Sequence, residues 1–383
     1  MSHAILSPSS AHRWLKCTPS AQLEALEPYS TSSYADEGTL AHRLAELLIK
    51  KQLGHITTPI YKNHLLAIQH DDLYTLEMAD YCQNFADYVI EQFNTLGLDA
   101  MIFTEDRVDL SEFVPGGFGT VDIRIVASGV LHVIDLKYGK GVPVFADDNP
   151  QLKLYALGAV LEMEHIYNMA DVVLTIYQPR LENISSYLLS VEELKAWGES
   201  ELRPRAALAW EGKGDFVPGT HCQFCKIKHK CRALAEYNLA TVREAFKNPA
   251  LLEPDEIAEI VQGQKAFTDW IGSVADYAYD QAVNHGVTWP GLKLVEGRSN
   301  RVYTDEVRIT EVLLAHGLSL EEIHTLKLKG ITEMSKLLGK GDFERILGDF
   351  ITKPAGKPVL VPEADKRAAF GAAERAKDAF KNF

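Results

Sequence analysis

The sequence contains no run of about 20 apolar residues, the length that a membrane-spanning helix requires. Its first residues, Met1 to Pro8, lack the basic-then-apolar order of a secretory signal peptide. It also shows no internal repeat and no low-complexity tract, which excludes repeat architectures. We therefore expect a cytoplasmic globular protein with no membrane partner.

Positive charge is also scarce. Lysine and arginine number 39 against 53 acidic residues, so the net charge is −14. This balance disfavours a broad basic surface, but it does not exclude a local groove that binds nucleic acid. The 383 residues, 46% of them hydrophobic, suffice for one large domain or two ordinary ones.

Cysteines are few and odd in number, which disfavours a disulfide framework. Three of the five lie within ten residues, as Cys222-Gln-Phe-Cys225-Lys-Ile-Lys-His-Lys-Cys231. The Cys-x₂-Cys spacing lets two thiolates reach one metal centre, and the third nearly completes a four-ligand set. From spacing alone, zinc and an iron–sulfur cluster are equally favoured, and the fourth ligand is Cys17 or a histidine such as His221 or His229.

Hydrophobic periodicity predicts a mixed α/β core. Helices are expected over 36–52, 72–96 and 149–163, and strands over 101–109, 119–126, 130–137 and 171–178. Cys82 is expected to be a small buried side chain on the second helix. The chain from residue 236 is expected to be mainly helical, with a long helix over 254–285, a hairpin near 290–304 and shorter helices up to about 350.

Two acids and a lysine lie at the ends of neighbouring predicted strands, in Gly119-Thr-Val-Asp122 and Asp135-Leu-Lys137. Residues i and i+2 of a strand share a face, so Asp135 and Lys137 emerge side by side. Phosphodiester hydrolysis requires a divalent cation held by oxygen ligands, and a lysine can orient the attacking water. Asp122, Asp135 and the Leu136 carbonyl are candidate metal ligands, and Lys137 is the candidate catalytic residue.

Each of these motifs is common when it stands alone. Asp-x-Lys is often a solvated pair, Gly-x-x-Asp is often a turn, and His42 fits the core of a leucine-rich helix. Gln151 and Tyr155, four residues apart, fit a half-exposed helix face. The combination and its order carry the information.

In that order and spacing, Gly119-x-x-Asp122, Asp135-x-Lys137 and Gln151-x-x-x-Tyr155 resemble the RecB branch of the PD-(D/E)XK nuclease superfamily. Gly38-Thr-Leu-Ala-His42-Arg-Leu-Ala-Glu46 resembles the helical motif of that branch. Over about residues 1–235, the resemblance implies a RecB-like core, in which helices flank a mixed central sheet. It also implies Mg²⁺ or Mn²⁺ bound by His42, Asp122 and Asp135, with Lys137 catalytic and with Gln151 and Tyr155 facing the DNA backbone and the active site. Glu37 and Glu105 are expected to contact these ligands.

The cysteines extend the resemblance to the nucleases of AddAB-type helicase–nucleases and of the CRISPR adaptation machinery. The segment Ser10-Ala-His-Arg-Trp14-Leu-Lys-Cys17 matches the N-terminal cysteine segment of those proteins. The resemblance implies that Cys17, Cys222, Cys225 and Cys231 bind a mainly structural [4Fe–4S] cluster.

These features together predict a metal-dependent exonuclease that processes DNA ends in phage-type recombination or replication. A single-strand annealing or single-strand-binding protein is an expected partner, and a homo-oligomer stays open. The alternatives are a structure-specific endonuclease and a catalytically silent DNA-binding scaffold. The expected domains are 1–235 for the nuclease, 236–352 for a helical domain, and 353–383 for a flexible tail with seven basic and four acidic residues, net +3.

Overall fold

The computed structural model describes residues 4–28, 33–97, 99–244, 254–294, 305–315, 317, 319–324, 330–347 and 350–351. The chain divides into two compact units, residues 1–278 and 279–383, whereas the sequence suggested a boundary after residue 235. The tail over 353–383 and residues 295–304 of the expected hairpin lie outside the described residues.

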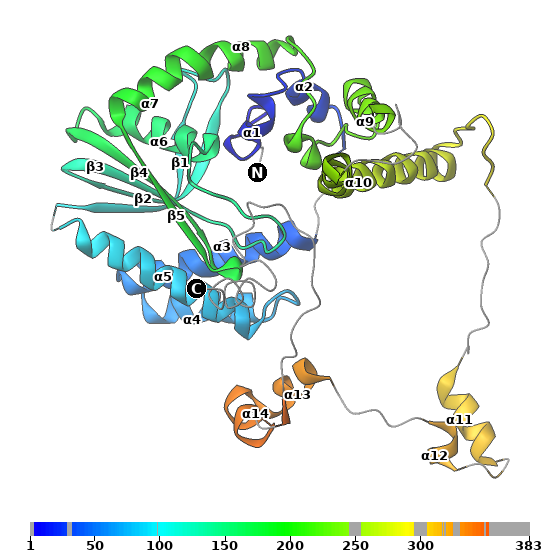
Figure 1. Cartoon of the computed structure of the whole chain (residues 1–383). Helices are drawn as coiled ribbons and strands as arrows, with labels where there is room; N and C mark the ends of the chain where they lie inside the picture. Colours follow the sequence, from blue (N-terminus) through cyan, green and yellow to red (C-terminus); the bar gives the residue numbers. More distant parts are fainter. Residues whose placement is uncertain are drawn as a thin grey trace, which may run out of the picture. The chain divides into compact units, whose positions relative to one another are not determined.

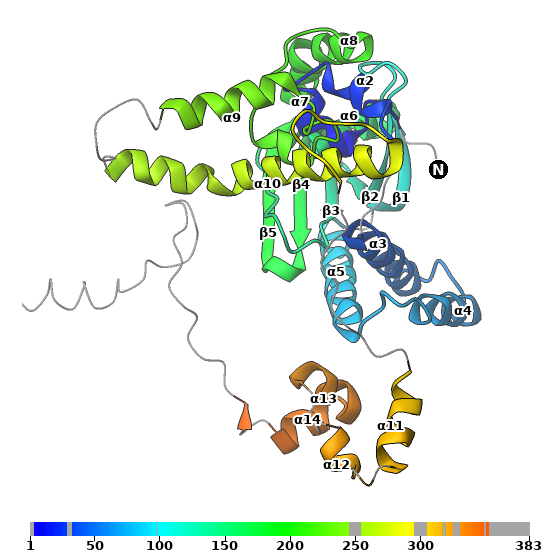
Figure 2. The ribbon, with the colours of Figure 1, turned by 90° about the vertical axis from the view of Figure 1, so that its right-hand side faces the viewer.

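The first unit is built on a five-stranded mixed sheet, which confirms the predicted α/β class. Its strands follow the chain order, as Figure 2 shows from β5 to β1. Only β3 and β4 pair in parallel, and the other neighbours are antiparallel. The strands are β1 (Met101–Asp109), β2 (Phe118–Ala127), β3 (Gly129–Leu136), β4 (Met169–Gln178) and β5 (Asn183–Ser190).

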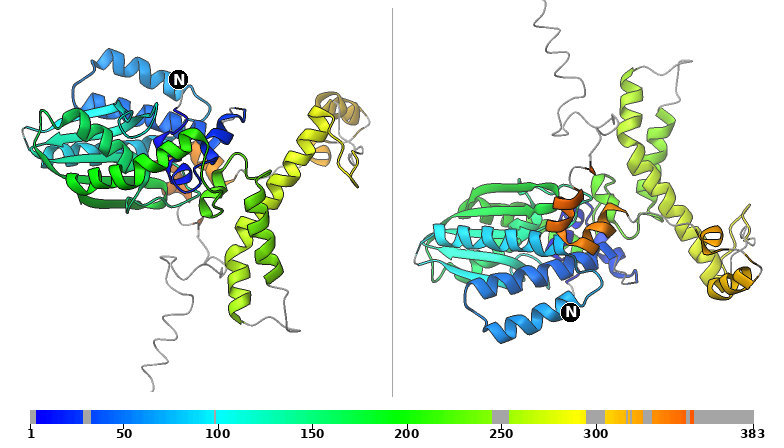
Figure 3. Two further views of the ribbon diagram at one scale, coloured as in Figure 1. Left: turned by 90° about the horizontal axis from the view of Figure 1, so that it is seen from above. Right: turned by 90° about the horizontal axis from the view of Figure 1, so that it is seen from below.

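Helices cover both faces of the sheet (Figures 1 and 3). One face packs against α3 (Ser33–Gln52) and α5 (Leu76–Thr95), and α4 (Thr58–Gln69) packs on α3. Leu44 and Phe85 share this core with Ile125 of β2. Cys82 of α5 is buried there, as predicted, and its thiol donates to the Ala41 carbonyl at 3.4 Å.

The opposite face packs against α6 (Pro150–Met163), which is the crossover between β3 and β4, and against α7 (Val191–Trp197). The N-terminal segment joins this core through Leu6 and Trp14. This segment begins with a 3-10 turn over Pro8–Ser10 before α1 (Ala11–Trp14). The side chain of Ser7 makes no capping hydrogen bond to this turn, and its hydroxyl lies 2.8 Å from the Ser10 hydroxyl.

The other described elements are short, apart from one long helix. The sequence predicted that helix over 254–285, and the structure has α10 over Pro254–His285 with no residue buried. None of the described helices combines the length and the apolar character needed to cross a membrane. The remaining elements are α2 (Ser20–Ala25), a 3-10 turn (Pro179–Leu181), a π-helical turn (Gly198–Leu202), α8 (Arg203–Glu211), a 3-10 turn (Thr220–Phe224), α9 (Arg232–Glu244), α11 (Glu306–Ala315), α12 (Leu320–Ile323), α13 (Ile331–Leu338) and α14 (Lys340–Leu347).

Candidate functional site

The site is organised around a local irregularity in β1 and β2. Along β2, Val121 belongs to the core under α6, whereas Ile123 belongs to the core under α3 and α5. Residues two apart normally share a face, so the side-chain alternation changes phase at Asp122. The residue opposite Asp122 in the register is Glu105, whose φ of 47° lies in the left-handed region. Both acids therefore lie at the point where the strand pair is distorted.

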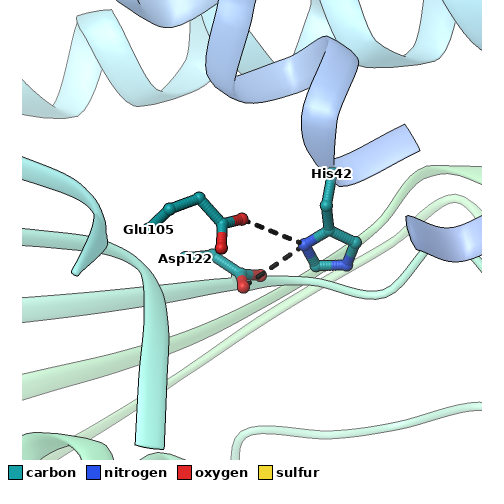
Figure 4. A group of neighbouring side chains, drawn as sticks. All are labelled: His42, Glu105 and Asp122. Atoms are coloured by element: carbon teal, nitrogen blue, oxygen red, sulfur yellow. Dashed lines mark ion pairs between the residues drawn. The ribbon is translucent and has the colours of Figure 1, made fainter. Parts of the chain in front are cut away.

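His42 of α3 completes this part of the site (Figure 4). Its Nδ1 atom lies 3.3 Å from Asp122 Oδ1 and 3.7 Å from Glu105 Oε1. One ligand atom from each of the three residues lies within 4.8 Å of the others. An imidazole nitrogen with two carboxylate oxygens is a donor set that suits a divalent cation of the Mn²⁺ type.

Asp122 also joins this group to β3. Its Oδ2 atom accepts a hydrogen bond from the backbone N–H of Leu136 at 2.7 Å. The contact fixes the carboxylate and brings the Leu136 peptide group beside the site. Its carbonyl as a metal ligand stays a prediction.

The second half of the site is a hydrogen-bonded chain of four side chains. Lys137 Nζ lies 2.7 Å from Asp135 Oδ2 and donates to Gln151 Oε1 at 2.9 Å. Gln151 Nε2 donates to Asp135 Oδ1 at 3.0 Å and to the Tyr155 hydroxyl at 3.1 Å. Asp135 Oδ2 is buried and accepts no hydrogen bond with good geometry, despite the close lysine. The structure thus brings all the predicted catalytic side chains to one place.

Gln151 and Tyr155 reach this place because of how α6 begins. The side chain of Asn149 accepts hydrogen bonds from the backbone N–H groups of Gln151 and Leu152, and Pro150 occupies the first turn. Residues four apart lie on one helix face, so Gln151 and Tyr155 point together. The cap therefore sets the position of the two side chains along the sheet.

Gly119 of the Gly-x-x-Asp motif has a packing role. A Cβ atom at this position would lie 2.7 Å from Tyr155 Cε1 and 2.8 Å from Pro8 Cγ. Any larger residue would therefore force the tyrosine ring or the proline ring to shift. This spacing requirement links the motif on β2 to the motif on α6.

The charges of the site perturb its pKa values. Burial lowers the pKa of His42, but Asp122 and Glu105 raise it more, so that it lies well above its ordinary value. Burial raises the pKa of Asp122, yet His42 and Lys137 leave it lowered. Burial raises the pKa of Asp135 to about 6, against the opposing effect of Lys137. The raised pKa values of His42 and Asp135 mean that bound protons partly neutralise the clustered carboxylates. A bound metal cation would take over this role and displace the protons.

The two glutamates that the sequence associated with the site differ in their positions. Glu105 lies among the candidate ligands, whereas Glu37 forms an ion pair with Arg180 at 2.9 Å. Nothing in the regular alternation of β1 indicates that Glu105 turns toward α3. Only the strand register, which places Glu105 across from Asp122, indicates that the two carboxylates lie close together.

The four predicted cluster cysteines line one small cavity in the first unit. Cys17 and Cys225 are buried, and Cys222 and Cys231 are partly buried. Within the described residues, no three cysteine sulfurs lie within 4.8 Å of one another. A tetrahedral zinc with bonds of about 2.3 Å would require sulfurs about 3.8 Å apart. The sulfurs are therefore spaced too widely for a zinc site in this conformation.

Burial dominates the chemistry of these thiols. It raises the pKa of Cys17 and Cys222, and it raises the pKa of Cys225 to about 12. Backbone hydrogen bonds at Val217 and Ser20 lower the pKa of Cys17 but do not offset burial. The nearby Arg13 lowers the pKa of Cys222 and Cys225, but it does not offset the effect of burial.

Long-range polar contacts hold the N-terminal segment against residues 205–231. Glu24, which is buried, accepts from Arg13 Nε at 2.9 Å and from the backbone N–H of Lys226 at 2.7 Å. Thr18 donates to the Lys213 carbonyl at 2.6 Å, and Lys230 pairs with Glu27. Of the candidate fourth ligands, Cys17 and His221 both line the cavity of the three clustered cysteines, whereas His229 does not.

The match to known families extends over most of the chain. A family model described as "Protein of unknown function (DUF2800)" matches residues 3–368. The chain belongs to this family. A solved structure described as "Crystal structure of SSO0001" is 16% identical, with a TM-score of 0.25, over 58% of this chain and 96% of that chain. A TM-score this low carries no inference about fold or function.

Proposed function

We propose that this DUF2800 protein is a metal-dependent deoxyribonuclease with a RecB-like PD-(D/E)XK core. One observation carries the proposal. Side chains from α3, β1, β2, β3 and α6 meet at one end of the sheet, with the donor types that phosphodiester hydrolysis requires. A histidine and two carboxylates form one contact group, and a carboxylate, a lysine, an amide and a tyrosine form the other.

The residues fit a hard divalent cation. His42, Glu105 and Asp122 offer converging donor atoms, and Asp135 adds a buried carboxylate whose Oδ2 atom is paired with Lys137. A bound Mg²⁺ or Mn²⁺ would supply Lewis acidity toward the phosphodiester and the attacking water. Its ligands would be His42, Asp122 and Asp135, with the Leu136 carbonyl as the remaining predicted ligand.

Lys137 is suited to orient the nucleophile. Asp135 and Gln151 fix its ammonium group from two sides, so the side chain has little freedom to turn away. A fixed ammonium group beside the scissile phosphate would stabilise the negative charge that develops during hydrolysis. Gln151 passes this constraint to Tyr155, whose hydroxyl accepts from the same amide.

The cysteines support a second part of the proposal, a [4Fe–4S] cluster instead of zinc. Four cysteines around one cavity suit either group, and the resemblance of the two cysteine segments favours the cluster. A cluster at this place would join residues 4–28 to the end of the nuclease core.

The presence of both acids, the lysine, the glutamine and the tyrosine in contact favours an enzyme over a silent DNA-binding scaffold. An exonuclease that acts on DNA ends follows from the resemblance and is the leading form of the proposal. A structure-specific endonuclease is the second. Recombination or replication of the phage type, and an annealing or single-strand-binding partner, remain predictions of the same resemblance.

The test is incubation of the purified chain with end-labelled single- and double-stranded DNA, in Mg²⁺, in Mn²⁺ and in EDTA. We expect mononucleotides or short products from linear DNA with either metal, and none with EDTA. Circular single-stranded and nicked duplex DNA serve as controls, because only an endonuclease cuts a circle. Absence of cleavage of every substrate would contradict the proposal.

A further inference from the structure

The segment between Lys137 and α6 is held in place by a side chain that the mechanism above does not use. This segment, the 138–146 loop, begins at Tyr138 and ends at Ala146, both of which are buried. Residues 139–143 and 145 between them are exposed. A loop with two anchored ends and an exposed middle needs further contacts to keep one conformation.

Gln178, the last residue of β4, supplies those contacts. It is 1% exposed, and its side-chain oxygen accepts from the backbone N–H of Val144 at 3.0 Å. Its side-chain nitrogen donates to the carbonyls of Gly139 at 2.8 Å and Val142 at 2.9 Å. Three hydrogen bonds from one buried amide therefore fix the backbone on both sides of Lys140.

Asn183, the first residue of β5, strengthens the arrangement. Its Nδ2 atom donates to the Val144 carbonyl at 2.7 Å and to Gln178 Oε1 at 3.3 Å. Ser185 adds a hydroxyl acceptor for the backbone N–H of Ala146 at 3.0 Å. Hydrogen bonds thus attach the 138–146 loop to the end of β4 and the beginning of β5.

The middle of the loop is open to a ligand. Gly139 and Gly141 flank exposed Lys140, and a Cβ atom at either glycine would meet nothing within 4 Å. Neither glycine has a positive φ, so neither packing nor backbone conformation requires glycine there. A lysine between two small residues lets a phosphate approach both the ammonium group and the backbone N–H groups.

We propose that the 138–146 loop binds a phosphate of the substrate strand next to the scissile one, through Lys140, and that Gln178 is its positioning residue. The inference rests on the proposed function for the identity of the ligand, a nucleic-acid phosphate. The side chain of Gln178 bonds the 138–146 loop, whereas Asp135 and Gln151 hold the ammonium group of Lys137. We therefore expect loss of Gln178 to weaken substrate binding and to spare the chemical step.

The test combines amide hydrogen exchange with steady-state kinetics on the full chain. In Gln178→Met, which keeps the size of the side chain, we expect the Val144 N–H to exchange at least about tenfold faster. We expect KM for DNA to rise about tenfold, with kcat within about twofold of wild type. Lys140→Ala should raise KM similarly, and the double variant should be no worse than either single variant, because both remove the same contact.

Thr175→Val is the matched control. Thr175 lies three residues earlier on the same strand, is equally buried, and bonds His132 and Ser186 on the sheet face opposite to α6. We expect this variant to lose stability with KM unchanged. If Gln178→Met fails to fold, Asn183→Ser tests the loop from β5, with the same direction of change.

The outcomes separate the inference from the function on which it rests. Unchanged exchange at Val144 in Gln178→Met overturns the positioning role, whether or not the protein cuts DNA. Faster exchange with unchanged KM, or fully additive effects of the two substitutions, overturns the substrate-binding role. Wild-type protein that cuts no DNA overturns the proposed function, and the exchange measurement still decides whether Gln178 orders the loop.

Discussion

Two sites of this protein differ in how the chain holds them. The acid–lysine site runs from His42 to Tyr155, and the cysteine cavity is lined by Cys17 and the 222–231 cysteines. The first is linked by side-chain contacts of 2.7–3.7 Å from His42 through Asp122 and, separately, from Asp135 to Tyr155. The second collects four cysteines from two segments about 200 residues apart, and their sulfurs do not approach closely. The fold assembles the first site by itself. At the second site, the proposed cluster would draw its ligands together.

This difference has a thermodynamic consequence. A preassembled site can lose its cation without loss of structure, because hydrogen bonds already satisfy most of its groups. A site whose ligands are buried thiols gains its folding free energy from the bound metal. If the two sites bind the proposed cation and cluster, removal of the cation should leave the fold stable, and removal of the cluster should destabilise it.

The largest expected effect is on catalysis. Lys137→Met should reduce the rate of hydrolysis at least about a hundredfold, because the lysine ammonium group beside the reacting phosphate is lost. Its affinity for Mn²⁺, measured by calorimetric titration, should stay near that of wild type. Asp122→Asn should lose both activity and Mn²⁺ binding. Exposed Lys62 on α4 offers the control substitution, Lys62→Ala, which should change neither.

The next effect is on stability at the cysteine cavity. Cys17→Ala should lower the melting temperature by about 10 °C or more, and abolish the broad absorbance near about 400 nm expected of thiolate-bound iron. Cys82→Ala is the matched control, because Cys82 is buried elsewhere and donates to the Ala41 carbonyl. It should lower the melting temperature less and keep the absorbance. A colourless wild-type protein with stoichiometric zinc would contradict the cluster.

A third effect lies outside both sites. Burial lowers the pKa of His132 to about 4, and its Nε2 atom lies 2.8 Å from the Thr175 hydroxyl. The folded state disfavours protonation of His132. The free energy of unfolding is therefore highest above about pH 6.5, the pKa of histidine in the unfolded chain, and falls by about 3 kcal/mol as the pH drops to about 4. His132→Gln should flatten this part of the stability curve, measured by urea unfolding between pH 7 and 4. An equally steep curve in the variant would rule out His132 as the cause.

The smallest expected effect concerns the packing contact between Gly119 on β2 and Tyr155 on α6. Gly119→Ala places a methyl group against the Tyr155 ring and Pro8, and overpacking of this kind costs about 1–3 kcal/mol. The displaced tyrosine should disturb Gln151 and lower kcat about tenfold. Gly129→Ala would be a poor control, because its φ is 88°, whereas Gly38→Ala on α3 meets open space. Equal activity of Gly119→Ala and wild type would remove the packing role.

Much of the fold follows from local sequence patterns. The strand expected over 101–109 has those bounds, and the helix expected over 149–163 begins one residue later, at Pro150. Such patterns succeed where one face of an element is consistently buried. The edge strand β5 was not predicted, because Asn183-Ile-Ser-Ser-Tyr-Leu-Leu-Ser190 places three serines in a short segment and lacks a clear buried stripe. The helix α4 was missed for a similar reason, since Ile68 is its buried residue.

The candidate site was predictable only in part. The residues from His42 to Tyr155 could be grouped because their motifs follow a known order. Glu105 was expected beside the ligands, but its convergence with His42 and Asp122 could not be predicted, because it depends on a left-handed backbone and a change of strand phase that no alternation pattern encodes. Gln178 was missed because its role depends on a loop conformation, which side-chain hydrogen bonds decide.

The most direct test of the account is the rate of nucleotide release from end-labelled linear DNA, with wild-type protein and Lys137→Met compared in Mn²⁺ and in EDTA. We predict that the wild type releases nucleotides in Mn²⁺ but not in EDTA, and that EDTA leaves its melting temperature nearly unchanged. Release by Lys137→Met at the wild-type rate, or release by the wild type in EDTA, would contradict it.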